Sequence, residues 1–122
     1  MCLVSNTLKP KKAKKDIVCY KYLKVVEGDG IHSPFNTQFK WKIGDEYVAE
    51  NEKYRRGRYE ISQGYFHTYA KYTDCYYCAN RHTDAIICMC VIPKGTYYYE
   101  GMVNGGVCDG YASKHLKIVR LC

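Results

Sequence analysis

Residues 85–92 read AIICMCVI, an apolar run without a single polar break. A strand with one face in solvent alternates apolar and polar residues, whereas a run that is apolar at every position is typical of a strand buried on both faces. Pro93-Lys94-Gly95 follows as a turn, and residues 96–99 (TYYY) predict another strand. We therefore expect residues 85–92 to be the buried central strand of a sheet.

Further strands are expected on both sides of this run. Residues 16–26 are rich in β-branched and aromatic side chains, residues 38–43 alternate with Phe39, Trp41 and Ile43 on one face, and residues 115–121 close the sheet. Residues 64–67 predict a short extended segment. Loops are expected at residues 31–35, at the charged stretch 50–58, and at the glycine-rich stretch 100–110, which we expect to be mobile.

One main helix is predicted at about residues 74–82, with Thr73 and Asp74 as candidate caps. Several strands and one helix indicate an α+β fold with a mixed or antiparallel sheet. A chain of 122 residues suits a single compact domain. We expect it to occupy residues 16–122, preceded by a loosely ordered basic arm at residues 1–15.

The charge of the chain points to an anionic partner. The formal net charge is +7, and Tyr, with 14 residues, is the outlier in composition. A basic surface favours nucleic acid, a nucleotide or an acidic protein, and tyrosine is common in binding surfaces as well as in sheets. No signal peptide or membrane span can be identified, so a cytoplasmic location with reduced thiols is expected.

The cysteines allow three interpretations: a metal site, thiol redox chemistry and packing. Cys75, Cys78 and His82 recur at helical spacing and could hold zinc if a fourth ligand came from elsewhere. The second pair, Cys88 and Cys90, lies within a predicted strand rather than in the turn that a zinc knuckle uses. Packing as small apolar side chains is the favoured interpretation, with no metal and no cofactor.

The segment Gly64-Tyr65-Phe66, the pair Tyr77-Cys78, and the apolar run from Ile86 to the turn at Gly95 occur in this order. In this order of motifs, residues 59–121 resemble the core of the ADP-ribosyltransferase superfamily. The resemblance implies an ADP-ribosyltransferase-like fold in which these elements wall a nucleotide pocket. Nearly the whole chain is also similar to small phage and gut-bacterial proteins with a GFH-type segment and an IPKG turn.

The departure from the transferase pattern concerns catalysis. That family places a catalytic Glu at the start of its last core strand, where this chain reads YASKHL at residues 111–116. A lysine there would repel the positive charge that develops on the ribose. No catalytic residue is therefore predicted, and an active ADP-ribosyltransferase, which would need Glu100 in an unusual place, is the least favoured hypothesis.

A pocket that has lost its catalytic acid can still bind. The first hypothesis is a non-enzymatic binding protein for a small anionic nucleotide-type ligand, in a phage setting an immune signalling nucleotide. Aromatic rings would stack the base, while cations and backbone amides would hold phosphates. The predicted ligand-binding residues are Tyr65, Phe66, His67, Tyr69, Tyr97, Tyr99 and Lys114.

The alternative hypothesis is a basic module that binds nucleic acid or a protein. Its features are the lysine-rich arm and the interleaved Arg and Tyr residues of the stretch 53–59. Such a pattern can hold phosphates and stack bases. The candidate contact residues are Lys11, Lys12, Arg55, Arg56 and Arg58.

Overall fold

The apolar run that opened the sequence analysis forms β10 (Ala85–Ile92), and its central position is confirmed. β10 lies between β3 (Ile17–Val26), with which it pairs along its whole length, and β13 (His115–Leu121). The structure is a computed structural model that describes residues 3–26, 30–33, 36–49, 54–55, 60–63, 65–81, 85–103 and 107–122. Three of the predicted strands are therefore the framework of the sheet.

The remaining described elements are one helix, α1, and ten short strands. Their bounds are β1 (Leu3–Ser5), β2 (Lys11–Lys12), β4 (Gly30–Ser33), β5 (Asn36–Trp41), β6 (Glu46–Val48), β7 (Tyr54–Arg55), β8 (Glu60–Gln63), β9 (Phe66–Tyr69), α1 (Tyr72–Ala79), β11 (Tyr97–Val103) and β12 (Cys108–Ser113). The strand order is β6-β13-β10-β3-β9-β12-β11-β1-β8-β7, with β2 added to β11 and the β4–β5 hairpin added to β3. The pairs between described strands are antiparallel. The sequence predicted either a mixed or an antiparallel sheet, and the described pairs agree with the second.

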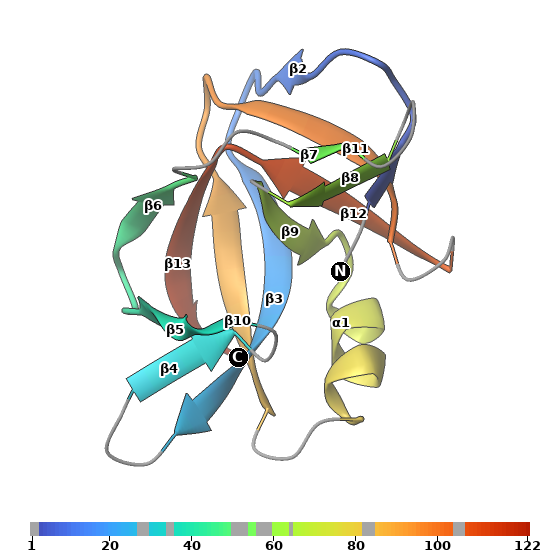
Figure 1. Cartoon of the computed structure of the whole chain (residues 1–122). Helices are drawn as coiled ribbons and strands as arrows, with labels where there is room; N and C mark the ends of the chain where they lie inside the picture. Colours follow the sequence, from blue (N-terminus) through green and yellow to red (C-terminus); the bar gives the residue numbers. More distant parts are fainter. Residues whose placement is uncertain are drawn as a thin grey trace.

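The sheet has two halves that meet at a single residue pair. β3 and β9 pair only at Tyr20 and Tyr69, whereas β11 and β12 pair over six residues. In Figure 1, β13, β10 and β3 run side by side down the molecule, while β11 and β12 cross above them at a steep angle. The single pair is therefore the point at which the sheet bends.

Each face of β3 and β10 covers its own hydrophobic core. One core contains Tyr22, Ile87 and Tyr99 together with the buried residues of α1. The other contains Cys19, Cys88, Cys90 and Ile92, and Trp41 of β5 packs into it from the hairpin. Burial on both sides explains why residues 85–92 are apolar at every position.

The predicted N-terminal arm contributes two strands to the sheet. β1 pairs with both β11 and β8, and Leu3 is completely buried, while β2 pairs with Tyr97 and Tyr98 of β11. The expectation of a loosely ordered arm over residues 1–15 is thus corrected for its described part. The signal was weak because these strands are very short and their partners are remote in sequence, from Glu60 opposite Val4 to Val103 opposite Leu3, at distances that local patterns do not report.

The expected mobile loop at residues 100–110 is wrong over most of its length. β11 continues to Val103 and β12 begins at Cys108, and only residues 104–106 between them lie outside the described part of the chain. A Cβ on Gly101 would overlap the carbonyl oxygen of Val4, and one on Gly110 would lie 2.6 Å from the carbonyl oxygen of Thr68. These glycines allow close approach of neighbouring strands and do not mark a loop.

Three other elements, β4, β5 and α1, also differ from the predictions. A loop was expected at residues 31–35, but residues 30–33 form β4, and Ile43, expected in a strand, lies outside β5 and is exposed. α1 begins two residues early, at Tyr72, with Lys71 as its N-cap and no side-chain capping bond. Tyr72 packs edge-on against Tyr20 of β3, and this tertiary contact accompanies the earlier start. α1 ends at Ala79, because the N–H of Arg81 already donates to the carbonyl of Cys78 in a tighter turn.

Candidate binding site

Most of the predicted ligand-binding residues share one face of the half of the sheet that contains β9, β12 and β11. His67, Ala112 and Tyr99 are neighbours in register across β9, β12 and β11, so their side chains point to the same side. Tyr65 and Tyr69 flank His67 at a spacing of two, and Tyr97 does the same for Tyr99. Alternation along the strands therefore places five of the seven predicted residues on this face. Lys114 lies beside Tyr97, to which it is hydrogen-bonded, and Phe66 is the one predicted residue that faces the other side.

Burial divides this set into two groups. Tyr69 and Tyr99 are completely or almost completely buried, and His67 is also buried. The Tyr69 ring lies 6.1 Å from that of Tyr22 within the core beneath α1. Phe66 faces the opposite side, with its ring 5.4 Å from Trp41. These four predicted residues are part of the packing that supports the surface.

The other predicted residues form a surface that we call the basic aromatic strip, made of Lys12, Tyr97, Tyr65 and Lys114. Lys12 is the register partner of Tyr97, whose side chain is 52% exposed. Lys114 donates its backbone N–H to the carbonyl of Tyr97, at 3.2 Å, and its Nζ lies 6.0 Å from the ring centroid of Tyr65. Tyr65 in turn lies against buried Tyr99, with ring centroids 5.8 Å apart. Cations and rings thus alternate along the strip.

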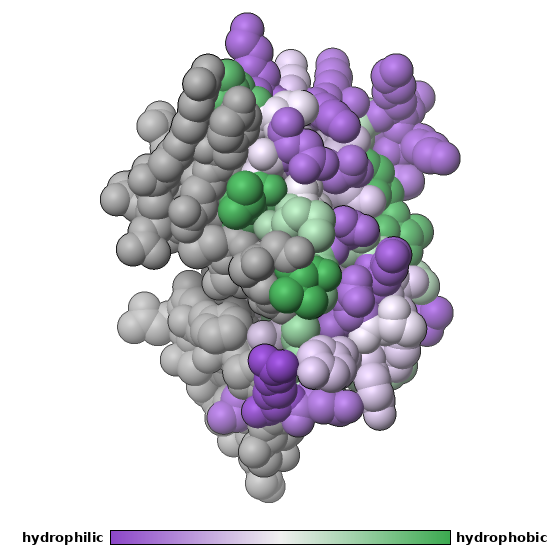
Figure 2. Space-filling model, turned by 90° about the vertical axis from the view of Figure 1, so that its right-hand side faces the viewer, coloured by the Kyte–Doolittle hydropathy of each residue, from purple (hydrophilic) through white to green (hydrophobic). Residues whose placement is uncertain are grey.

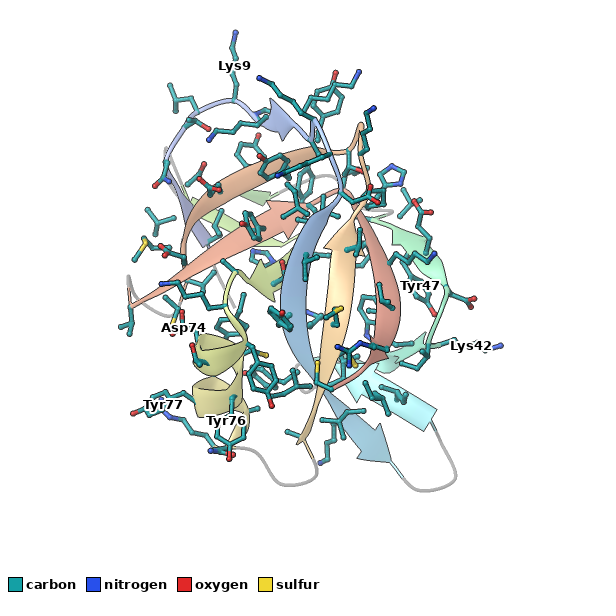
Figure 3. The ribbon with its side chains drawn as sticks, turned by 180° about the vertical axis from the view of Figure 1, so that it is seen from behind. Lys9, Lys42, Tyr47, Asp74, Tyr76 and Tyr77 are labelled. Atoms are coloured by element: carbon teal, nitrogen blue, oxygen red, sulfur yellow. The ribbon has the colours of Figure 1, made fainter. Side chains whose placement is uncertain are left out.

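The strip lies at the end of the molecule where half of the lysines of the chain gather, which we call the lysine end. The β2 segment packs on the β10–β11 turn through two backbone bonds between Ala13 and residues Gly95 and Thr96. Figure 1 shows β2 and this turn at the top, and Figure 3 shows Lys9 projecting from the same end. The lysines of the lysine end are Lys9, Lys11, Lys12, Lys14, Lys15, Lys94 and Lys114.

Two carboxylates of described residues contact the lysine end. Glu100 lies 3.8 Å from the Nζ of Lys11, and Asp16 accepts the backbone N–H of Lys94 at 2.9 Å. The first contact joins two side chains that are both nearly half exposed, so it adds little to stability. Seven lysines set against these two acids leave an excess of positive charge over this part of the described chain.

Lys21 is a buried lysine with defined contacts that the sequence analysis did not identify. Its Nζ donates to the backbone carbonyl of His67 at 3.0 Å and lies 5.9 Å from the ring centroid of Trp41. Burial lowers the pKa of Lys21, because the charged form loses solvation, although the nearby thiols partly oppose this shift. The carbonyl that it binds belongs to β9 just where β9 leaves β3, so Lys21 supports the bend of the sheet.

The buried histidine has a defined proton position. His67 Nδ1 lies 3.1 Å from the carbonyl oxygen of Tyr65. A carbonyl oxygen only accepts hydrogen bonds, so Nδ1 carries the proton and donates. This bond ties Tyr65 of the strip to the buried ring beneath it.

Six of the seven cysteines in the described part of the chain are buried, and Cys122 is exposed. Cys75 and Cys78 are buried in α1, while His82 lies outside the described residues. Within the described part of the chain, no group of three metal-binding side chains is close enough to hold an ion. Burial raises the pKa of the Cys75 thiol to about 12, so this group is not a ready thiolate.

None of the three arginines of the alternative hypothesis has a side chain in the described part of the structure. Arg56 and Arg58 lie outside the described residues, and Arg55 belongs to β7, of which only the backbone is described. Lys11 and Lys12 are exposed on β2 at the lysine end. The lysines are therefore the part of that hypothesis that the structure places.

Comparison of the chain with known protein families, curated proteins and solved structures finds no match. The resemblance to the ADP-ribosyltransferase core and to phage and gut-bacterial proteins therefore stays a prediction. Among the described elements, no helix has the length and apolar character needed to cross a membrane.

Proposed function

We propose that the protein is a non-enzymatic binding protein for a nucleotide-type anion, and that this ligand is a nucleic acid rather than a free nucleotide. The observation that supports the proposal is the basic aromatic strip, in which Lys12 and Lys114 flank the rings of Tyr97 and Tyr65. Lysines hold phosphates as point charges, and tyrosine rings stack on bases. The strip supplies both kinds of contact side by side.

The burial pattern favours the polymer over the free nucleotide. A small-ligand site encloses most of its ligand with side chains. Tyr69, Tyr99 and His67, which were expected to form such walls, instead pack in the core. The remaining groups, exposed Lys12 and Tyr97 and partly exposed Tyr65 and Lys114, lie beside further exposed lysines, an arrangement that suits the repeated charges of a nucleic acid.

Equilibrium titration of a labelled oligonucleotide by fluorescence anisotropy, at several salt concentrations, tests the proposal. We expect the logarithm of the affinity to fall linearly with the logarithm of the salt concentration, because binding releases counterions from the phosphates. In the double variant Lys12→Gln/Lys114→Gln the slope should decrease by about 0.7 to 0.9 for each lost phosphate contact. The control is Lys42→Gln, which removes one positive charge from the region of Tyr47, well away from the lysine end (Figure 3).

The competing ligands are tested in the same titration. Free mono- and dinucleotides should compete only weakly, since each offers few phosphates. If a free nucleotide displaced the oligonucleotide at equal or lower concentration, the small-ligand hypothesis would replace this one. An affinity that was independent of salt and equal in the double variant and in Lys42→Gln would refute the role of the strip.

A further inference from the structure

α1 exposes three large aromatic side chains on its outer face. Its inner face is formed by the buried residues Cys75, Cys78 and Ala79. On the outer face the exposed fractions of Tyr72, Tyr76 and Tyr77 are 41%, 51% and 64%. A single exposed ring needs no explanation, but neighbouring rings on two turns of one helix form a patch of the kind that marks a binding surface.

These rings are held in place by one another and by a cation. The Tyr72 and Tyr76 rings stack, with centroids 6.1 Å apart and an interplanar angle of 27°, and Tyr20 fixes Tyr72 edge-on at 5.7 Å. The Arg81 guanidinium lies 5.2 Å from the centroid of the Tyr77 ring. Figure 3 shows Tyr76 and Tyr77 extending from the helix away from the sheet. Because their positions are restrained before binding, less conformational entropy is lost when a partner is stacked on them.

The charges around the patch favour an anionic partner. Lys71 precedes the helix and Arg81 follows it, while Asp74 is the acidic residue of its first turn. The Arg81 guanidinium is charged at neutral pH like any arginine, and hydrogen bonding to Tyr77 raises its pKa further. We name the set Tyr72, Tyr76, Tyr77 and Arg81 the α1 tyrosine patch.

The patch lies within reach of the basic aromatic strip. Tyr65 of the strip directly precedes β9, and β9 leads through Ala70 and Lys71 into α1. The four residues of β9 span about 13 Å at the usual rise of a strand. In Figure 2 hydrophilic side chains occupy the top of the face that carries α1, and pale, near-neutral side chains lie toward its lower edge. One strand of several nucleotides is long enough to contact both surfaces.

We propose that the α1 tyrosine patch stacks unpaired bases, so that the protein selects single-stranded over double-stranded nucleic acid. This inference rests on the proposed function, because it assigns the phosphates of the same strand to the lysine end. Bases of a duplex are stacked on one another and present only their edges, so tyrosine rings cannot intercalate along it without unstacking it. Stacking on tyrosine is available to any unpaired base, and the selectivity is therefore for strandedness and not for sequence.

The test compares a single-stranded oligonucleotide with its duplex form, using the full chain and anisotropy titrations at constant salt. The variants are Tyr76→Ala/Tyr77→Ala, Tyr76→Phe/Tyr77→Phe and the control Thr73→Ala, which alters an exposed residue of the same helix. We expect the alanine variant to bind the single strand about tenfold more weakly for each lost ring, with duplex binding unchanged. The phenylalanine variant, which keeps the rings, and Thr73→Ala should bind like the parent chain.

The outcomes separate this inference from the proposed function. If the alanine variant binds the single strand like the parent chain while Lys12→Gln/Lys114→Gln binds weakly, the stacking proposal is refuted and the proposed function stands. If neither nucleic acid binds the parent chain, both are refuted. Equal loss of single-strand and duplex binding in the alanine variant would also refute stacking. Circular dichroism of each variant establishes that the helix and sheet are retained.

Discussion

At the scale of single residues, the hydroxyl groups of two buried serines, Ser5 and Ser113, have opposite effects on stability. The Ser5 hydroxyl donates to the carbonyl of Thr7 at 2.7 Å and accepts the Thr7 N–H at 3.1 Å. The Ser113 hydroxyl is completely buried on β12, and no hydrogen-bond partner is found for it among the described residues. A buried hydroxyl without a partner loses its solvation without compensation.

Replacing these two serines should therefore change stability in opposite directions. Ser113→Ala is expected to raise the free energy of unfolding by about 1 kcal/mol, because it removes an uncompensated polar group. Ser5→Ala is expected to lower it by about 1 kcal/mol, because it removes a hydrogen-bonded one. Urea unfolding followed by circular dichroism measures both, and a loss of stability in Ser113→Ala would show that its hydroxyl has a partner.

At the scale of elements, the attachment of the N-terminal strand depends on one missing side chain. β1 pairs with β11 in the register of Ser5 opposite Gly101. A side chain on Gly101 would collide with the backbone of Val4 and Ser5, which cannot move as a flexible side chain would. Gly101 is therefore required by the close approach of β1, which also brings buried Leu3 into the core.

The variant Gly101→Ala should destabilise the domain by about 1–3 kcal/mol, the usual cost of an added group in a closely packed region. The neighbouring Glu100→Ala is the control, because this side chain is about 42% exposed and its contact with Lys11 is weak. Thermal unfolding compares the two variants with the parent chain. Equal melting temperatures for all three would mean that β1 is not closely packed against β11.

At the scale of the whole molecule, the buried thiols predict how stability varies with pH. Burial raises the pKa of Cys19 and Cys75 from 9.0 to about 12 and that of Cys88 to about 11, and it raises the pKa of Cys90 further still. Above pH 9 the unfolded chain loses these protons while the folded chain keeps them. The folded state then binds more protons than the unfolded state, so stability is complete below pH 9 and falls as pH rises.

We expect the free energy of unfolding to decrease above pH 9 by on the order of 1 kcal/mol for each buried cysteine and pH unit. The lowered pKa of Lys21 acts in the opposite direction, because its buried charge is relieved as pH rises, but it is one group against four. Urea titrations at a series of pH values, with a reductant present, measure the slope. Cys75→Ala should give a shallower slope than the parent chain, and a flat profile in the parent chain would contradict the prediction.

The local pattern of the sequence was sufficient for the central framework and for the helix. Residues 85–92 were identifiable as a central strand because both of their faces are buried, and α1 was found to within two or three residues. Residues 64–67 were also predicted to be extended, and β9 (Phe66–Tyr69) overlaps this segment. These features depend on residues close together in the chain, and so the sequence by itself determined them.

Only the tertiary structure decided which aromatic rings are accessible. Alternation tells which residues share a face of a strand but not what covers that face. Tyr69 and Tyr99 are buried in the core beneath α1, whereas Tyr97, two residues before Tyr99 on β11, stays exposed. The joining of β2 to β11, the close approach at Gly101 and the gathering of lysines from distant segments at one end likewise depend on pairings across the whole chain. Such contacts form between residues that are remote in sequence, so no local window contains them.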